Sequence, residues 1–234
     1  MLTDLRTEIK KHASEERKKA HLWYFKTGKG EYGEHDQFIG VTVPQSRAIA
    51  KQFKDLSLAD AKTLLMSPVH EERLIALFIL NHQFAKGDEQ TKKNIIELYL
   101  SHTKWINNWD LVDSSASQIV GTYLLDKKPT IIMNLAKSSS LWERRIAMIA
   151  TAAYIKKGHC ELTYHIAEML LPDTHDLIHK AVGWMLREAG KNCGETELEL
   201  FLKKHLKDMP RTALRYAIEK FSEKKRQAYL KGAL

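Results

Sequence analysis

A helical pattern that returns at intervals of about 35 residues constrains this chain more than any other feature. From Pro44 onward apolar residues recur three and four positions apart, as in Leu74, Leu77 and Phe78, which is the periodicity of helices. Short interruptions with proline or glycine separate these segments at 67–68, 86–88, 128–129, 157–158, 172–173 and 209–210. No alternating apolar and polar run of strand length occurs, so the sequence predicts an all-α fold.

A basic residue followed by an apolar pair marks one position in each repeat. Thirty-five residues separate Arg145 from Lys180 and Lys180 from Arg215, and 72 separate Arg73 from Arg145. The missing unit falls at Asp110, which lies 37 residues after Arg73 and 35 before Arg145. Helix pairs of this length are typical of HEAT-like solenoids. We therefore predict a HEAT-like helical repeat solenoid, with all 234 residues in a single domain.

The register predicts where these basic anchors lie. In such a solenoid the second helix of each pair lines the concave face, so Arg73, Arg145, Lys180 and Arg215 would form a basic groove. Free amides at helix N-termini would add to its attraction for anions. The composition agrees, since 37 Lys and Arg against 29 Asp and Glu give a net charge of +8. This excess favours a nucleic acid as the partner, although a charge run is more often only a solvated face.

The composition also bears on the cellular compartment. The longest apolar stretch, 146–155, is shorter than the roughly 20 residues that span a bilayer, and the charged residues of 1–11 predict no secretory leader. Cys160 and Cys193 lack CxxC spacing, so we expect neither a zinc ribbon nor a redox pair. We expect both thiols to be reduced. These features predict a cytoplasmic protein, nucleoid-associated if bacterial, with no membrane partner.

Two short helices and a loop precede the repeats. Residues 2–12 predict an amphipathic helix, and Ser14 predicts the cap of a second helix that ends in Trp23-Tyr24-Phe25. The loop 28–37 holds three glycines within six residues, but no strand precedes it and no Gly-Lys-Ser/Thr follows, so a Walker loop is not expected.

The stretch from Trp105 to Asp113, with the sequence WINNWDLVD, carries the clearest chemical signal. If it is helical, Trp109 and Asp113 share a face and Trp105 lies one turn earlier. An indole beside a carboxylate attracts cations. Taken by themselves, the two residues would more often be a core tryptophan and a surface or capping acid. Asp110 suits a structural role at a helix start better than a second catalytic role.

Five segments of the chain, taken in order, carry a resemblance to a known family. They are Phe38-Ile39-Gly40-Val41-Thr42-Val43-Pro44, WDLVD at 109–113, WERR at 142–145, KAVGWMLRE at 180–188 and MPRTALRYA at 209–217. The chain resembles the AlkD-like family of HEAT-repeat DNA glycosylases, also called DNA alkylation repair proteins. The segments cover nearly the whole chain.

The resemblance implies a hydrolase that excises positively charged alkylated bases, such as 3-methyladenine and 7-methylguanine, from double-stranded DNA. Carried over residue by residue, it makes Asp113 the catalytic carboxylate, Trp109 and Trp184 the aromatic side chains beside the lesion, and Arg145 a DNA-contacting arginine. The remaining predicted DNA contacts are Arg73, Lys180, Arg187, Arg211 and Arg215, of which Lys180 and Arg187 flank Trp184 and would hold phosphates.

Two further functions stay open at this level. A non-catalytic HEAT scaffold could bind damaged or branched DNA, as is thought for relatives with a reduced N-terminal region, whereas a protein-binding adaptor would predict apolar or acidic anchors. His175 and His179 have metal-ligand spacing, but no third ligand accompanies them. We predict a monomer that uses no metal and no cofactor.

Overall fold

The computed structural model describes residues 1–232, which form helices and no strand. A lone parallel bridge joins Gln37 and Val69. The all-α class predicted from the sequence is therefore confirmed. None of the helices in this range combines the length and the apolar character that crossing a membrane requires. The chain divides into two compact units, Met1–Ser115 and a second that begins at Ala116, and each is described by itself.

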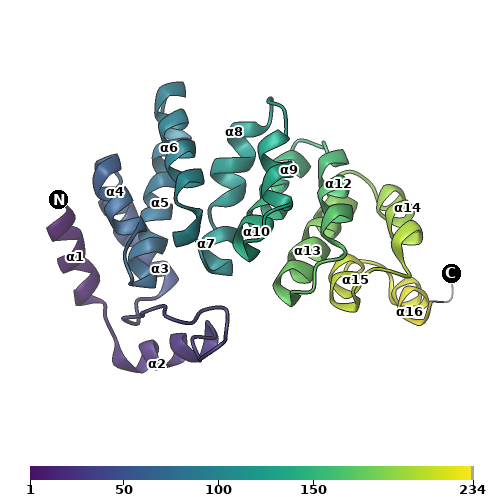
Figure 1. Ribbon diagram of the computed structural model, residues 1–234, viewed down its shortest axis with the longest axis horizontal. Helices are drawn as coiled ribbons and strands as arrows, with labels where there is room; N and C mark the ends of the chain where they lie inside the picture. The colour runs from purple at the N-terminus through teal and green to yellow at the C-terminus, as the bar shows by residue number, and fades with distance from the viewer. Residues whose placement is uncertain (233–234) are drawn as a thin grey trace. The chain divides into compact units, whose positions relative to one another are not determined.

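The first unit contains seven α-helices and one 3₁₀ turn among its described residues (Figure 1). In chain order they are α1 (Leu2–Lys11), α2 (Glu15–Tyr24), α3 (Val43–Gln52), α4 (Leu58–Leu65), α5 (His70–Lys86), α6 (Glu89–Ser101), η1 (Thr103–Trp105) and α7 (Trp109–Asp113).

The second unit begins with a π-helical turn, η2 (Ser117–Gly121). The helices that follow are α8 (Thr122–Leu124), α9 (Thr130–Ala136), α10 (Leu141–Ala150), α11 (Ala152–Ile155), α12 (Glu161–Leu170), α13 (Asp176–Asn192), α14 (Glu195–His205), α15 (Arg211–Ala217) and α16 (Glu223–Lys231).

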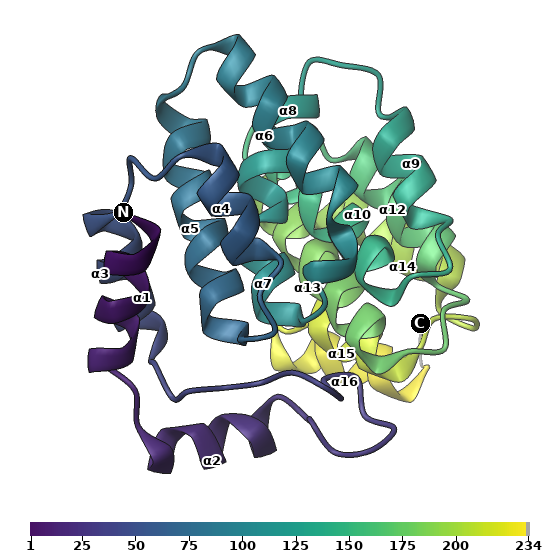
Figure 2. The same ribbon diagram turned by 60° about the vertical axis from the view of Figure 1, so that its left-hand side comes forward.

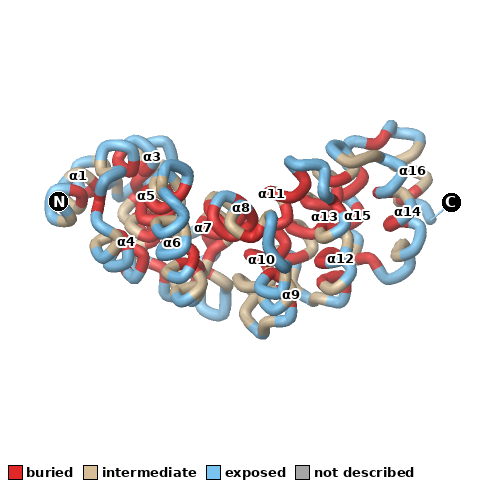
Figure 3. Tube along the Cα trace, turned by 90° about the horizontal axis from the view of Figure 1, so that it is seen from above, coloured by how far each residue is buried: buried red, intermediate tan, exposed pale blue. Residues whose placement is uncertain are grey.

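Helix α5 is the core helix of the first unit. Every residue from Leu74 to Leu80 is buried, and a helix that is apolar on all sides must be covered on all sides. Helices α3, α4, α6 and α7 pack against it, and Figure 3 shows α5 as a largely buried segment. The residues at the start of α5 therefore lie where several elements of this unit meet.

Helix pairs repeat in the second unit. Helices α10, α13 and α15 pack on one another in succession, while α9 packs on α10 and both α12 and α14 pack on α13. The anchors Arg145, Lys180 and Arg215 are each the fifth residue of their helix, in α10, α13 and α15. The interval of 35 residues thus marks equivalent positions in α10, α13 and α15. Gly183 lets α13 approach α15, because a Cβ there would lie 2.4 Å from the Ala213 carbonyl oxygen.

Helix α2, in the N-terminal part of the first unit, lies apart from the core helices. Helix α2 buries none of its residues and runs across the lower ends of α3 and α5 (Figures 1 and 2). The predicted cap is confirmed, since the Ser14 hydroxyl accepts a hydrogen bond from the Arg17 amide. The Ser14 amide donates to the Ile39 carbonyl at 2.9 Å. Gly40 has φ +83°, and a Cβ there would meet the Ser14 carbonyl oxygen at 2.1 Å, so this contact requires glycine.

The stretch from Trp105 to Asp113 is not one helix. Trp105 ends the turn η1, and α7 begins only at Trp109 because the Asn108 side chain caps it, accepting from the Trp109 amide at 2.9 Å. Trp109 and Asp113 therefore share a helix as predicted, whereas the prediction that Trp105 lies one turn earlier on the same helix is wrong.

Cys160 and Cys193 form a disulfide, with their Cα atoms 6.4 Å apart. The prediction of two unpaired, reduced thiols is therefore corrected. Cys160 directly precedes α12 and Cys193 directly follows α13. These two helices pack as a hairpin, which brings the start of one beside the end of the other, within the usual range of Cα separations for a disulfide.

We expect reduction of this disulfide to lower the free energy of unfolding by about 2–4 kcal/mol, because the bond restricts the unfolded chain. Urea denaturation with and without dithiothreitol measures the effect, and the Cys160→Ser/Cys193→Ser double variant is the control that should not respond to the reductant. Two thiols that titrate in the native, unreduced protein would contradict the pairing.

Candidate active site

A cavity of about 450 Å³ in the first unit brings Trp109 and Asp113 together. Its lining comes from α2, α3, α5 and α7 and the residues next to them: His21, Tyr24, Phe25, Val43, Arg47, Leu74, Phe78, Trp109, Asp110, Asp113 and Ser114. The lining is thus mainly apolar and aromatic, with two carboxylates from α7 and one arginine from α3. Such cavities, with a few convergent polar groups, are typical of binding and active sites.

Trp109 is held by aromatic neighbours from the N-terminal part of the chain. The Phe25 ring stacks on the indole with centroids 5.4 Å apart, and the Tyr24 ring meets it edge-on at 5.7 Å. Trp109 itself is half-buried, and Tyr24 is 55% exposed. Trp109 therefore forms part of the cavity wall and is not a fully buried core residue.

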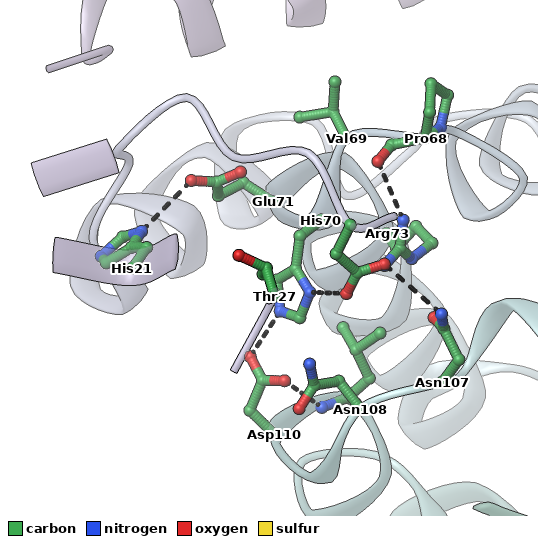
Figure 4. Close-up of polar contacts among 12 residues, drawn as sticks. His21, Thr27, Pro68, Val69, His70, Glu71, Arg73, Asn107, Asn108 and Asp110 are labelled. Atoms are coloured by element: carbon green, nitrogen blue, oxygen red, sulfur yellow. Dashed lines mark hydrogen bonds and ion pairs between the residues drawn. The ribbon is translucent and has the colours of Figure 1, made fainter. Parts of the chain in front are cut away.

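His70, the first residue of α5, bridges two carboxylates from separate parts of the unit (Figure 4). Its Nδ1 lies 3.1 Å from Asp36 Oδ2 and its Nε2 lies 2.8 Å from Asp110 Oδ2. Burial lowers the pKa of His70, but the Asp110 and Asp36 carboxylates outweigh it and raise the pKa to about 9. His70 is therefore an imidazolium at neutral pH.

Asp36 joins the glycine-rich loop to this network. Besides His70, its carboxylate accepts a hydrogen bond from Arg73 Nη2 at 2.6 Å and one from Asn107 Nδ2 at 3.4 Å. Burial raises the pKa of Asp36, but the bond to His70 and the charge of Arg73 lower it below the ordinary value. The end of the loop 28–37 is thus fastened beside α7.

Glu71 is a second buried charge at the start of α5, with only 2% of its surface exposed. Its carboxylate accepts hydrogen bonds from the backbone amides of Ile39, Gly40 and Val41, and its Oε1 lies 3.4 Å from His21 Nδ1. The Glu71 carboxylate therefore holds the segment between the loop and α3 and connects it to α2.

Arg73 does not occupy the place predicted for it. Its side chain is 2% exposed, and its guanidinium donates to the Asp36 carboxylate and to the carbonyls of Ser67 and Pro68. A phosphate contact at Arg73 is therefore not supported, because its donors face buried acceptors of its own unit. Arg73 was predicted as an anchor from its spacing, but its guanidinium is a buried structural cation.

The predicted site residues of the second unit differ in their exposure. Trp184, on α13, is half-buried, and Lys180 is half-buried with Nζ 2.8 Å from Asp176 Oδ2. Arg145 is only 4% exposed and donates to the Leu177 carbonyl, so its guanidinium, like that of Arg73, is held inside the helices. Trp184 and Trp109 belong to different units, and their meeting at one site stays a prediction.

The other three predicted DNA contacts lie nearer the surface. Arg187 is bonded to the carboxylates of Glu188 and Glu219, whereas Arg215 is exposed. Arg211 is also exposed, and its Nη2 donates to the Leu230 carbonyl. His175 and His179 serve the start of α13: His175 Nδ1 accepts from the Leu177 amide, and His179 Nε2 bonds to the Asp173 carbonyl.

Comparison with known proteins identifies the family of the chain. The sequence profile described as "DNA alkylation repair enzyme" matches residues 5–221, which is most of the chain. The chain belongs to this AlkD-like repair family. Among solved structures, a predicted DNA alkylation repair enzyme from Enterococcus faecalis is similar, with a TM-score of 0.71 at 17% identity, over 91% of this chain and 98% of the other. The search of curated proteins gives no match.

Two of the segments that carry the family resemblance now have a structural explanation. In Phe38–Pro44 the Phe38 ring stacks on His70 at 4.5 Å, Gly40 allows the contact with Ser14, and Thr42 caps α3 in a capping box with Gln45. Gly183 allows α13 to pack on α15. These residues build the scaffold, and Trp109 with Asp113 faces the cavity.

The sequence alone did not identify three side chains that line the cavity, Tyr24, Phe25 and Arg47, nor His70, which is bonded to the lining residue Asp110. Arg47 is exposed on α3, with its Cζ 4.1 Å from the centroid of the Phe78 ring. The aromatic run at the end of α2 was a usable signal, because three aromatic residues beside a glycine-rich loop suit a site. His70 carried no local signal, since its partners lie 34 and 40 residues away.

We expect the stability of this protein to fall as the pH rises from 6.5 to 9. The pKa of His70 is raised from 6.5 to about 9, so its stabilising contribution is full below pH 6.5 and is lost as the pH passes 9. The linked free energy is roughly 3 kcal/mol. Urea unfolding across this range measures it, and the decline should be absent in His70→Gln. An equal decline in that variant would assign it to other groups.

Proposed function

We propose that this protein is a monofunctional DNA glycosylase that removes positively charged alkylated bases, of the 3-methyladenine and 7-methylguanine type, from double-stranded DNA. The observation that carries the proposal is the presence of the Asp113 carboxylate and the Trp109 indole in one largely apolar cavity. Membership in the DNA alkylation repair enzyme family supports it. The proposal requires neither a metal nor a cofactor.

The chemistry follows from the charge of the substrate. A cationic base is already a good leaving group, so it needs no protonation. When the bond between the sugar C1′ and the base nitrogen breaks, the electron pair leaves with the base and neutralises it, and positive charge develops on the sugar. Asp113 would oppose this charge, which is most effective where water is excluded. A water oxygen then bonds to C1′ and its proton passes to solvent, leaving an abasic site.

The aromatic side chains have a complementary role in this proposal. Trp109 would form one wall of the site and exclude water, and its ring face would favour the cationic sugar. We also propose Trp184, on α13, as a residue that acts on the lesion. Asp110 would not act on the substrate, because its Oδ2 is bonded to His70 and its Oδ1 to the Leu111 amide.

For the DNA we propose a basic groove along the helix pairs of the second unit. Lys180, Arg211 and Arg215 are the proposed phosphate contacts, because they keep exposed surface on α13 and α15. Arg187 would join them when DNA replaces the carboxylates it now meets. Arg73 and Arg145 are left out, since both are buried.

Replacing Asp113 with Asn should reduce excision by about two orders of magnitude or more, the scale of losing one preorganised electrostatic group. DNA affinity should hold or rise, because the change removes a negative charge. Single-turnover release of free base from a 7-methylguanine duplex measures the rate. The matched control is Asp55→Asn, an exposed acid of the same unit, which should excise at the wild-type rate.

Two results would contradict the assignment. Excision by Asp113→Asn close to the wild-type rate would show that another group stabilises the sugar. A wild-type protein that binds the duplex without releasing base would favour the non-catalytic DNA-binding scaffold.

Replacing Lys180 or Arg215 with Ala should weaken binding to any duplex sequence and lower the slope of log K against log salt by about 0.9 for each change. Fluorescence anisotropy over a salt series measures the slope. Lys203→Ala, at an exposed lysine on α14, which carries none of the proposed contacts, is the control and should keep it. Unchanged slopes in both variants would remove the groove from the proposal.

A further inference from the structure

The helix that carries the candidate catalytic groups is too short to hold its own position. Helix α7 has five residues, from Trp109 to Asp113, whereas isolated helices of fewer than about 12 residues are marginal in water. Two side-chain contacts hold its first turn: the buried Asn108 cap and the bond from Asp110 to His70. Asp110 lies between Trp109 and Asp113 in this single turn.

We infer that His70 is a positioning residue for the reaction: as an imidazolium bonded to Asp36 and Asp110, it fixes α7 so that Asp113 and Trp109 face the cavity. The inference rests on the proposed function. His70 does not line the cavity, and its action on the substrate would be entirely through its neighbours.

The geometry of these two contacts also fits the charged form of His70. Both ring nitrogens lie within hydrogen-bond distance of carboxylate oxygens, at 3.1 Å and 2.8 Å. Ionised carboxylates only accept hydrogen bonds, so both nitrogens must donate, and only the imidazolium has two N–H groups. A neutral His70 would lose one of the two bonds, and α7 would lose its connection either to the loop or to α5.

His70 also reaches Trp109 through a stack of rings. The Phe38 ring covers His70 at 4.5 Å, Phe25 lies 4.9 Å from it, and Phe25 in turn stacks on Trp109 at 5.4 Å. The buried His70 imidazolium thus contacts α7 through the Asp110 carboxylate. It also contacts the Phe25 ring, which stacks on the Trp109 indole.

The charges around His70 separate the two acids of the cavity. Asp110 and Asp113 both line it, but Asp110 is paired with His70. Asp36, in turn, is shared between His70 and Arg73, and Glu71 is turned to the amides of 39–41. The bond to His70 thus distinguishes Asp110 from Asp113, although both acids line the same cavity.

The test compares binding of two duplexes that carry sugar analogues, a cationic azaribose and a neutral tetrahydrofuran. The ratio of the two dissociation constants reports how well a carboxylate faces the sugar position. In His70→Gln we expect this preference for the cation to fall about tenfold or more, because small misplacements of a charged group are costly, while affinity for the neutral duplex stays within about twofold. His82→Gln, an exposed histidine on the same helix, is the matched control.

Excision supplies a second readout. The wild-type rate should fall as the pH passes about 9, where His70 loses its proton, and His70→Gln should lack this alkaline decline. His70→Gln/Asp110→Asn should regain part of the cation preference, because removing both partners leaves no unpaired buried charge. Circular dichroism and melting temperatures verify that each variant is folded, and the double variant replaces His70→Gln if the single change unfolds the protein.

The outcomes separate this inference from the proposed function. Loss of the cation preference in His70→Gln with no excision by the wild type would keep the positioning role and reject the glycosylase. An unchanged preference would overturn the positioning role. A stronger preference would also overturn it, since His70 would then act only as a nearby positive charge that opposes the cationic sugar.

Discussion

The organisation of the first unit depends on two buried charges at the start of α5, His70 and Glu71. An anion is stabilised at a helix N-terminus by the free amides and the helix dipole, whereas a cation is not. Glu71 therefore suits its position and binds three further amides, while His70 requires carboxylates on both nitrogens. Because a buried charge without its partner is strongly destabilising, these contacts fix which segments meet at this point.

The same contacts connect the scaffold to the chemistry. The Asp36 carboxylate comes from the glycine-rich loop, the Glu71 acceptors come from the segment before α3, and Asp110 comes from the single turn of α7. The loop is thus a structural part of the site, although it does not line the cavity. An all-helical protein, whose long helices pack through apolar faces, here uses ionic contacts to place its short helix and its irregular segments.

The periodic basic residues show how one sequence pattern can cover two physical roles. Arg145, Lys180 and Arg215 occupy the same position in α10, α13 and α15, as their spacing indicated. Arg145 is nevertheless buried while Arg215 is exposed. The spacing of the repeat specifies at which position of its helix a residue lies. The packing of the neighbouring helices decides whether that residue is exposed to water. Arg73 was likewise turned inward by a carboxylate 37 residues away.

The sequence by itself determined the all-α class, several of the breaks between helices, the equivalence of the three anchors of the second unit and the shared helix of Trp109 and Asp113. All of these depend on contacts within a few residues, namely apolar periodicity, caps and breaks. Only the tertiary structure decided that Cys160 and Cys193 pair, that Tyr24 and Phe25 reach Trp109, and that Asp110 is paired with His70. These contacts join residues that are 33 to 85 positions apart, and no local spacing specifies which distant partners the packing of helices brings together.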